Sequence, residues 1–336
     1  MPKVSVLIPT YGYARFLPEA IESVLAQDFT DFELIISDDA SPDGSAEIIR
    51  RYATRDPRIR CEIHGRNLGM VANWNWCLGE ARGEYVKYLF GDDRLNSRHT
   101  LSRMVTMLEN EPRAVLAATG RLILDKDSQA TEVWDELGAP GRQDGRMVIA
   151  QCLRQDRNLV GEPSAVLFRR AAADRGFDPS WRQLVDQEMW FHLLTQGDLV
   201  YDPEPLCAFR LHPAQQTMVN RENRISSTET LLLLARYLDD FAAAVGQTID
   251  SRAICRMIFH QIYYSRKNSR RDAIRTPELA AAEAKLLARL TRGRYVRCLI
   301  LHRLLKPFFN LKRWLHPPPL GGRRPVIIVQ FEKGRE

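Results

Sequence analysis

The sequence predicts an α/β fold in which a mostly parallel sheet carries helices on both faces and a helical region follows. Two observations predict it. Short apolar runs of strand length alternate with amphipathic helical stretches through about the first 125 residues, and turn-forming residues mark the junctions. From about residue 226 onward the apolar spacing is helical. Regular alternation of strand and helix is typical of parallel sheets.

The first strand is expected at 3–8, where an apolar run ends at Pro9. The helix after it carries Pro18 in its first turn, where proline is tolerated because that amide hydrogen has no helical partner. Apolar residues in the stretch 20–25 give this helix one apolar face.

The second strand is expected at 32–37, followed by a helix that runs to about residue 53. Ser41 is the expected N-cap and Pro42 the first helical residue.

The same rhythm continues along the chain. Further strands are expected at 58–63, 84–90, 114–124, 160–168 and 199–212. Further helices are expected at 71–78, 98–109, 184–195, 231–238 and 254–264. The polar, glycine-containing stretch 125–145 is expected to be a mobile excursion.

Composition excludes several classes of protein. A chain of 336 residues with 45% hydrophobic content is long enough for one large or two ordinary domains. The six cysteines are scattered without CxxC pairs, so neither a zinc site nor a disulfide framework is indicated, and a reducing cytoplasm is the expected compartment. No apolar run reaches the roughly 18 residues of a spanning helix, and the N-terminal run is too short for a signal peptide.

Polar residues follow three of the expected strands. They are Pro9, Thr10 and Tyr11 after the first, Asp38 and Asp39 after the second, and Asp92 and Asp93 after the fourth. Ligands of such sheets bind beyond the carboxyl ends of the strands, so we expect these side chains to converge on one crevice.

Asp92 and Asp93 are suited to a divalent cation. Mg²⁺ and Mn²⁺ prefer oxygen ligands, and Mg²⁺ usually takes one or two carboxylates and completes its shell with substrate phosphates. The cofactor predicted is therefore Mn²⁺ or Mg²⁺, bound together with a nucleotide diphosphate. A simple turn at 91–93 is the alternative.

Five motifs together carry a resemblance to a known family. They are VSVLIPTY at 4–11, FELIISDDASPD at 32–43, NLG at 67–69, GEY at 83–85 and the aspartate pair at 92–93. In this order and spacing the chain resembles the family-two glycosyltransferases of the GT-A fold, over about residues 2–212. The resemblance implies an inverting transfer of a sugar from a nucleotide diphosphate to an acceptor hydroxyl.

The resemblance also implies roles at the nucleotide. Pro9, Thr10 and Tyr11 would border the nucleobase, with the Tyr11 ring as a stacking face. Asp39 would accept a hydrogen bond from the ring N–H of uracil or thymine. Capping of the helix that follows is the alternative for Asp39.

At the diphosphate, the resemblance implies that Asp93 binds the metal and that Asp92 faces the sugar or ribose. Many members have Ala-Arg-Asn where this chain has Asn73-Trp-Asn75, so the usual arginine is missing. Arg66, beside Asn67, is expected to replace it in binding the donor.

Inverting transfer requires a base that takes the proton of the acceptor hydroxyl. The segment VDQEMW at 185–190 resembles the family segment that carries this base, which implies that Asp186 is catalytic and that Glu188 is the accompanying acid. The alternative is that both are first-turn acids favoured by the helix dipole. The segment FRLH at 209–212 resembles one in which the histidine approaches the metal, so His212 is a predicted ligand.

The net charge of +6 comes from the C-terminal part, where 284–330 holds eleven Lys and Arg and no Asp or Glu. Cationic and apolar residues at helical spacing in 288–316 predict a helix on an anionic membrane surface, or one packed on the protein with a solvated basic face. No nucleic-acid motif accompanies the charge, so no nucleic-acid partner is expected.

The sequence thus predicts a GT-A domain at 1–215 with a donor-binding half at 1–125 and an acceptor half at 126–215, a helical region at 216–316 and a tail at 317–336. The predicted reaction uses a UDP- or dTDP-sugar and a saccharide or lipid-linked saccharide acceptor, as in bacterial surface polysaccharide or glycolipid assembly. The location would be the cytoplasm, or the inner face of its membrane. The alternatives are a GDP-sugar transferase, a non-catalytic nucleotide-binding or scaffold protein, and a nucleotidyltransferase.

Overall fold

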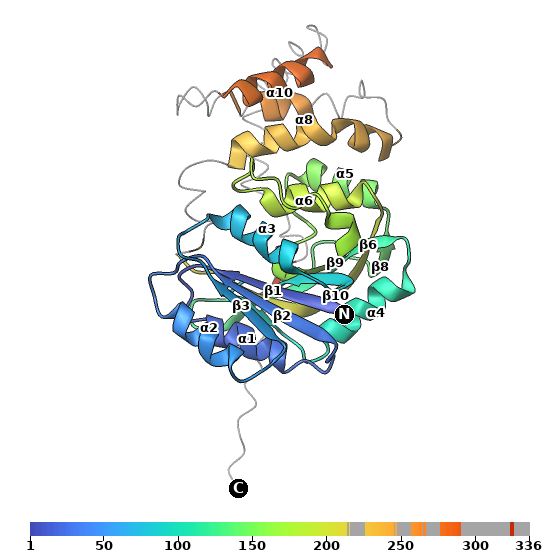
Figure 1. The fold of residues 1–336 in the computed structure, drawn as a ribbon. Helices are drawn as coiled ribbons and strands as arrows, with labels where there is room; N and C mark the ends of the chain where they lie inside the picture. The colour runs from blue at the N-terminus through green and yellow to red at the C-terminus, as the bar shows by residue number, and fades with distance from the viewer. Residues whose placement is uncertain are drawn as a thin grey trace.

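A computed structural model of the chain describes residues 1–213, 215, 226–244, 246, 257–263, 265–266, 276–289 and 323–325. Figure 1 shows a central sheet with helices on both faces, as the sequence predicts. In the described residues the sheet runs β11-β7-β6-β9-β4-β1-β2-β3, and β10 pairs with β5, β6 and β8.

The first half of the sheet is parallel. Its strands are β1 (Val4–Thr10), β2 (Phe32–Asp38), β3 (Ile59–Ile63) and β4 (Tyr85–Tyr88). β1 pairs with both β2 and β4, and β2 pairs with β3, all in parallel. Every residue of β1, β2 and β4 is buried, which explains why these strands read as continuous apolar runs.

Helices cover the two faces of this half. α1 (Leu17–Leu25), α2 (Ser45–Ala53) and α4 (Thr100–Asn110) share one core with Val4, Val6 and Ile8 of β1. α3 (Met70–Glu80) packs on the opposite face, where its Trp74 and Cys77 lie in a core with Leu7. The two sides of the strand therefore feed two separate cores.

The second half of the sheet is mixed. β6 (Ala114–Leu124) pairs antiparallel with β7 (Ala130–Trp134) and β9 (Val166–Arg169), and parallel with β10 (Asp198–Arg210). β9 also pairs antiparallel with β4, which joins the two halves. The short strands are β5 (Arg94–Leu95), β8 (Gly141–Gln143) and β11 (Arg323–Pro325).

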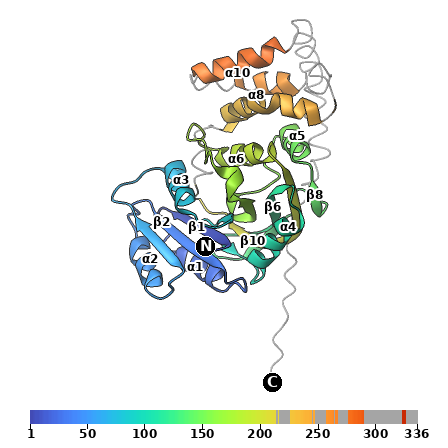
Figure 2. The ribbon, with the colours of Figure 1, turned by 45° about the vertical axis from the view of Figure 1, so that its right-hand side comes forward.

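A second group of helices extends away from the sheet, as Figure 2 shows. It comprises α5 (Gly145–Gln155), α6 (Val185–Leu194), α8 (Ser226–Ala244) and α10 (Pro277–Ala288), with the short helices η1 (Pro163–Ala165) and η2 (Arg170–Ala173) near the sheet. Apolar residues of α5, α6, α8 and α10 share the core that α3 also joins. The first helices of the C-terminal region are therefore continuous with the core of the sheet domain.

Three expectations for local structure are wrong. The stretch 125–145 is not a continuous loop, because it contains β7, which pairs with β6, and β8, which pairs with β10. The strand expected at 160–168 begins only at Val166, after the turn that η1 forms. α2 begins at Ser45 instead of Pro42, because Ser41 accepts a hydrogen bond from the backbone N–H of Gly12 and Asp43 accepts those of Ser45.

No helix of the described part of the chain is both long and apolar enough to cross a membrane. Of the basic segment 288–316, the structure describes only residues 288 and 289. Its contact with a membrane therefore stays a prediction.

Candidate active site

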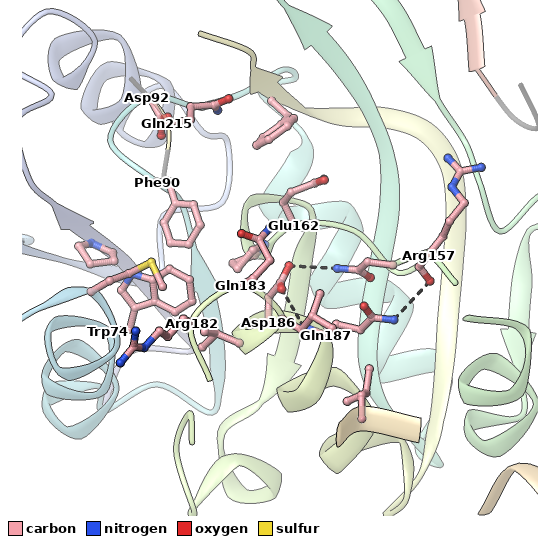
Figure 3. Close-up of a pocket in the computed structure, with 18 of the residues that line it drawn as sticks. Trp74, Phe90, Asp92, Arg157, Glu162, Arg182, Gln183, Asp186, Gln187 and Gln215 are labelled. Atoms are coloured by element: carbon pink, nitrogen blue, oxygen red, sulfur yellow. Dashed lines mark hydrogen bonds between the residues drawn. The ribbon is translucent and has the colours of Figure 1, made fainter. Parts of the chain in front are cut away.

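One cavity of about 840 Å³ opens at the carboxyl ends of β1, β2 and β4. Its walls include the predicted residues Pro9, Thr10, Tyr11, Asp39, Asn67, Asp92 and Asp186. It continues past the first turn of α6 to Thr230, Leu233 and Leu234 of α8. Figure 3 shows the stretch from Asp92 and Phe90 to Asp186 and Arg157. The fold therefore brings the predicted donor end and the predicted base into one cavity.

The nucleotide end is formed by β1, β2 and the loop before α3. Asp39 is 2% exposed, and its two carboxylate oxygens accept the backbone N–H groups of Leu68 at 2.5 Å and Gly69 at 3.0 Å. Asn67 donates to the backbone carbonyl of Asp39 at 3.1 Å. Each carboxylate oxygen has a second lone pair, so Asp39 can still accept a hydrogen bond from a ligand.

Tyr11 and Arg66, two further predicted donor-binding residues, differ from each other in their position relative to the cavity. Tyr11 is half exposed at the rim of the cavity, so its ring is free to cover a planar group. Arg66 is exposed and does not line the cavity, so this structure does not bring it to the donor end.

The two aspartates after β4 point in different directions. Asp93 is 1% exposed and accepts hydrogen bonds from the Ser164 hydroxyl and, at 2.9 Å, from the Arg210 backbone N–H. Asp92 lines the cavity, and its Oδ2 lies 3.1 Å from Nε2 of His212. In this geometry Asp92 faces the cavity, His212 contacts Asp92, and Asp93 is held inside the turn.

Arg210 holds this turn in place. It is fully buried, and its Nε donates to the backbone carbonyl of Asp92 at 2.7 Å while its Nη2 pairs with Glu19 at 2.7 Å. The sequence signal for this role is the arginine of FRLH at 209–212, a segment from which only the histidine is a predicted ligand.

Negative charge accumulates around Asp92. Burial and the charge of Asp92 raise the pKa of Asp93 well above its ordinary range. Burial, with the charges of Asp92 and Asp93, raises the pKa of Tyr13, whose ring lies edge-on to His212 at 5.9 Å. A divalent cation would relieve this excess of negative charge, so the donor set fits Mn²⁺ or Mg²⁺.

Among the described residues, no three His, Cys, Asp or Glu side chains converge as a complete metal site. Asp92 lines the cavity, and His212 lies within hydrogen-bond distance of it. Mg²⁺ usually binds few protein ligands and completes its coordination shell with substrate phosphates.

Asp186 occupies the first turn of α6. Its Oδ1 accepts the Gln187 backbone N–H at 2.8 Å, and its Oδ2 accepts the Asn158 amide at 3.0 Å. Burial, followed by the charge of Glu162, raises the pKa of Asp186 to about 7, although these hydrogen bonds oppose the rise. A carboxyl group with this pKa, facing a cavity, is suited to general base catalysis near neutral pH.

The loop before Asp186 is fixed by α8. Glu229, 5% exposed, accepts three backbone N–H groups, those of Arg182 at 2.7 Å, Gln183 at 2.9 Å and Leu184 at 2.7 Å. These three residues line the cavity directly before α6. Sequence reasoning did not find Glu229, because its partners are backbone groups 45 to 47 residues away along the chain.

Glu188, the second acid of the VDQEMW segment, does not reach the cavity. It is fully buried, and Arg175 binds it with two hydrogen bonds of 2.9 and 2.7 Å. Arg236 and Tyr237 of α8 add bonds of 2.7 and 2.9 Å. These contacts give Glu188 a role in joining α6 to α8.

Asn75, the residue that matches the family asparagine, is also structural. Its amide exchanges two 2.8 Å hydrogen bonds with the backbone of Phe177. The preceding Trp74 lines the cavity beside Phe90, with ring centroids 4.8 Å apart.

Comparison with known proteins identifies the family and the fold. Residues 5–177 match the model of glycosyl transferase family 2. Over 139 residues the chain is 30% identical to the GalNAc(5)-diNAcBac-PP-undecaprenol beta-1,3-glucosyltransferase of Campylobacter jejuni, an alignment that covers 41% of this chain and 44% of that protein.

Two solved structures share the fold. The S. aureus TarS 1–349 structure in complex with UDP superposes with a TM-score of 0.61 at 16% identity, covering 93% of this chain and 87% of that one. The mannosyltransferase PcManGT from Pyrobaculum calidifontis, in complex with GDP-Man and Mn²⁺, gives a TM-score of 0.55 at 17% identity and covers 91% and 88%. The match to the family model spans just over half of the sequence, and the chain therefore belongs to glycosyl transferase family 2.

Proposed function

We propose that this glycosyltransferase moves a sugar, with inversion, from a UDP- or dTDP-sugar to an acceptor hydroxyl, and that it requires Mn²⁺ or Mg²⁺. The observation that carries the proposal is that three carboxylates from separate elements line one cavity. Asp39 follows β2, Asp92 follows β4 and contacts His212, and Asp186 lies in the first turn of α6. A base site, a diphosphate site and a proton acceptor are what such a transfer needs, in that order.

The donor would be held from its nucleobase inward. Asp39 accepts the ring N–H of uracil or thymine, and Tyr11 covers the base at the rim. Asp92 and His212 would hold the cation, which would supply positive charge to neutralise the departing diphosphate. The role assigned to Asp93 on the basis of the resemblance stays a prediction, and its buried position favours support of the turn instead.

Asp186 would then act on the acceptor. About half of its carboxyl groups are ionised near pH 7, because its pKa is raised to about 7. The carboxylate takes the proton of the acceptor hydroxyl as that oxygen attacks the anomeric carbon, on the side opposite the leaving diphosphate. Asn158 and the backbone N–H of Gln187 hold the carboxylate in this orientation.

The acceptor is a saccharide or a lipid-linked saccharide in this proposal. The relative from Campylobacter jejuni, named for a polyprenyl-diphosphate-linked acceptor, supports it. The cationic and apolar composition of 288–316 supports contact with an anionic membrane surface during surface polysaccharide or glycolipid assembly. Co-sedimentation with phosphatidylglycerol vesicles, and its absence with phosphatidylcholine vesicles, is the expected result.

The direct test is donor turnover. The full chain is incubated with a panel of UDP-, dTDP- and GDP-sugars and Mn²⁺, with simple saccharides or water as acceptor. Release of UDP or dTDP is expected, to be abolished by EDTA and restored by Mn²⁺, and NMR of the product should show an inverted anomeric centre. Retention of configuration, or turnover that EDTA leaves unchanged, would contradict the proposed mechanism.

A further inference from the structure

Glu162 lies between the two halves of the site and belongs to none of the motifs discussed above. It lines the cavity, and its side chain is 25% exposed. Figure 3 shows it in the stretch between Asp92 and Asp186. Its negative charge contributes, after burial, to the raised pKa of Asp186.

The segment 161–164 connects these halves physically. At its end, Ser164 donates to Asp93 and accepts the backbone N–H of Phe90 at 3.1 Å. At its start, the Gly161 carbonyl accepts the Asn158 amide at 3.1 Å, and the same amide donates to Asp186. Glu162 therefore directly follows Gly161, which shares the Asn158 amide with Asp186. It lies two residues before Ser164, which contacts Asp93.

Glu162 is also fixed from behind. Its Oε2 lies 2.7 Å from Nε of Arg121, whose side chain is only 2% exposed. Arg121 also pairs with Glu136 at 2.8 Å. Gly161 has φ +113°, and a Cβ there would lie 2.7 Å from Nη1 of Arg121. The guanidinium is thus enclosed by the protein, while the carboxylate of Glu162 remains partly exposed to the cavity.

The sugar of a nucleotide-sugar must lie between its diphosphate and the base that activates the acceptor. We propose that Glu162 contacts this sugar, accepts hydrogen bonds from its hydroxyl groups, and selects a neutral sugar over a uronic acid. This inference rests on the proposed function, because it takes the position of the sugar from the assigned ends of the cavity.

The selection follows from charge. A neutral hexose presents hydroxyl donors, which a carboxylate accepts in charge-assisted hydrogen bonds. A uronate would bring a second negative charge beside Glu162 and close to Asp186. Three arginines line the cavity. The nearest to Glu162, Arg121, is 2% exposed and paired with two glutamates, Arg157 is paired with Glu136, and Arg182 belongs to the loop that Glu229 binds. This repulsion should weaken uronate binding about tenfold, which corresponds to about 1.4 kcal/mol.

The test compares sugars that differ only at C6. Isothermal titration calorimetry in the presence of Mn²⁺ measures the affinity of the chain for UDP and for two pairs of donors. The pairs are UDP-glucose and UDP-glucuronate, and UDP-galactose and UDP-galacturonate. GDP-mannose with GDP-mannuronate serves if GDP is the nucleotide bound. The wild-type chain should bind the neutral member of the pair about tenfold or more tightly than the uronate. Glu162→Gln should reduce this ratio to about threefold or less and leave the affinity for the nucleotide diphosphate within about twofold.

Glu204→Gln, at an exposed position on β10 outside the cavity, is the matched control and should keep the wild-type ratio. A wild-type chain that binds the uronate as tightly as the neutral sugar overturns the inference without any variant, so a poorly folded Glu162→Gln does not leave it untested. An unchanged ratio in a folded Glu162→Gln also overturns it. If no nucleotide diphosphate binds at all, the proposed function itself fails.

Discussion

Replacement of Asp186 by asparagine should strongly reduce catalysis and, near pH 8, stabilise the protein. The site holds this carboxyl group with a pKa raised to about 7, against an ordinary value of 3.8. A raised pKa means that the folded state favours the protonated form, so the stability contributed by this group is full below about pH 4 and is lost as the pH rises to 7.

The magnitude follows from the two pKa values. Their difference of about 3 pH units corresponds to roughly 4 kcal/mol as an upper limit above pH 7. Asparagine has one side-chain oxygen and cannot accept hydrogen bonds from both the Gln187 backbone N–H and the Asn158 amide. The loss of the Asn158 hydrogen bond lowers the gain in stability by about 1 kcal/mol. Partial exposure to the cavity weakens the effect of burial further. A net gain of about 2 kcal/mol is expected at pH 8, which corresponds to a rise in Tm of roughly 4 °C or more.

Differential scanning calorimetry at pH 8, 6 and 4.5 measures this gain, which should shrink as the pH falls. Asp178→Asn is the control, because Asp178 lies outside the cavity and its pKa is shifted in the opposite direction. Burial opposes ionisation of Asp178, but hydrogen bonds from Ser180 and the contact with Arg236 outweigh it and lower its pKa to about 2. Its stability contribution is present above pH 4 and lost toward pH 2, so the control should lower Tm at pH 8.

Transfer by Asp186→Asn should fall by roughly 10²- to 10⁴-fold in kcat, with donor affinity retained. In the wild type, kcat/KM should rise about tenfold per pH unit up to about pH 7 and then level off. An Asp186→Asn variant that keeps full transfer, or one that is less stable than wild type at pH 8, would refute the reasoning.

Three further predictions concern neighbouring groups. Asp92→Asn should lose the Mn²⁺-dependent part of nucleotide binding by calorimetry, whereas equal binding with and without Mn²⁺ in wild type would remove the metal role. Asp39→Ala should lower UDP affinity by about tenfold or more, since a charged acceptor and two loop contacts are lost, and an unchanged Kd would contradict this. Glu229→Ala should speed amide hydrogen exchange at residues 182–184 and lower kcat, whereas unchanged exchange there would show that its three hydrogen bonds do not hold the loop.

The parallel half of the fold could be predicted because its signals are local. β1, β2 and β4 are buried on both faces, so each is a short apolar run bounded by turn residues. The residues that follow these strands converge for a topological reason that needs no side-chain detail. Asp39 and Asp92 were therefore within reach of sequence reasoning.

The rest depended on contacts between distant residues. α5 was not predicted, and β7 and β8 lie in a stretch whose polar composition resembles a loop, although pairing with β6 and β10 orders them. The difference in direction between Asp92 and Asp93 arises from Ser164 and the Arg210 backbone, more than 70 residues away. Sequence position alone gives adjacent aspartates no reason to differ.

The central claim is that the cavity binds a pyrimidine nucleoside diphosphate through a divalent cation at Asp92 and His212. The most direct measurement is calorimetric titration of the full chain with UDP, dTDP, GDP and ADP, each with and without Mn²⁺. UDP or dTDP should bind to the wild type only with Mn²⁺, and this binding should be lost in Asp92→Asn. Absence of binding for every nucleotide, or the same affinity after EDTA treatment, would contradict it.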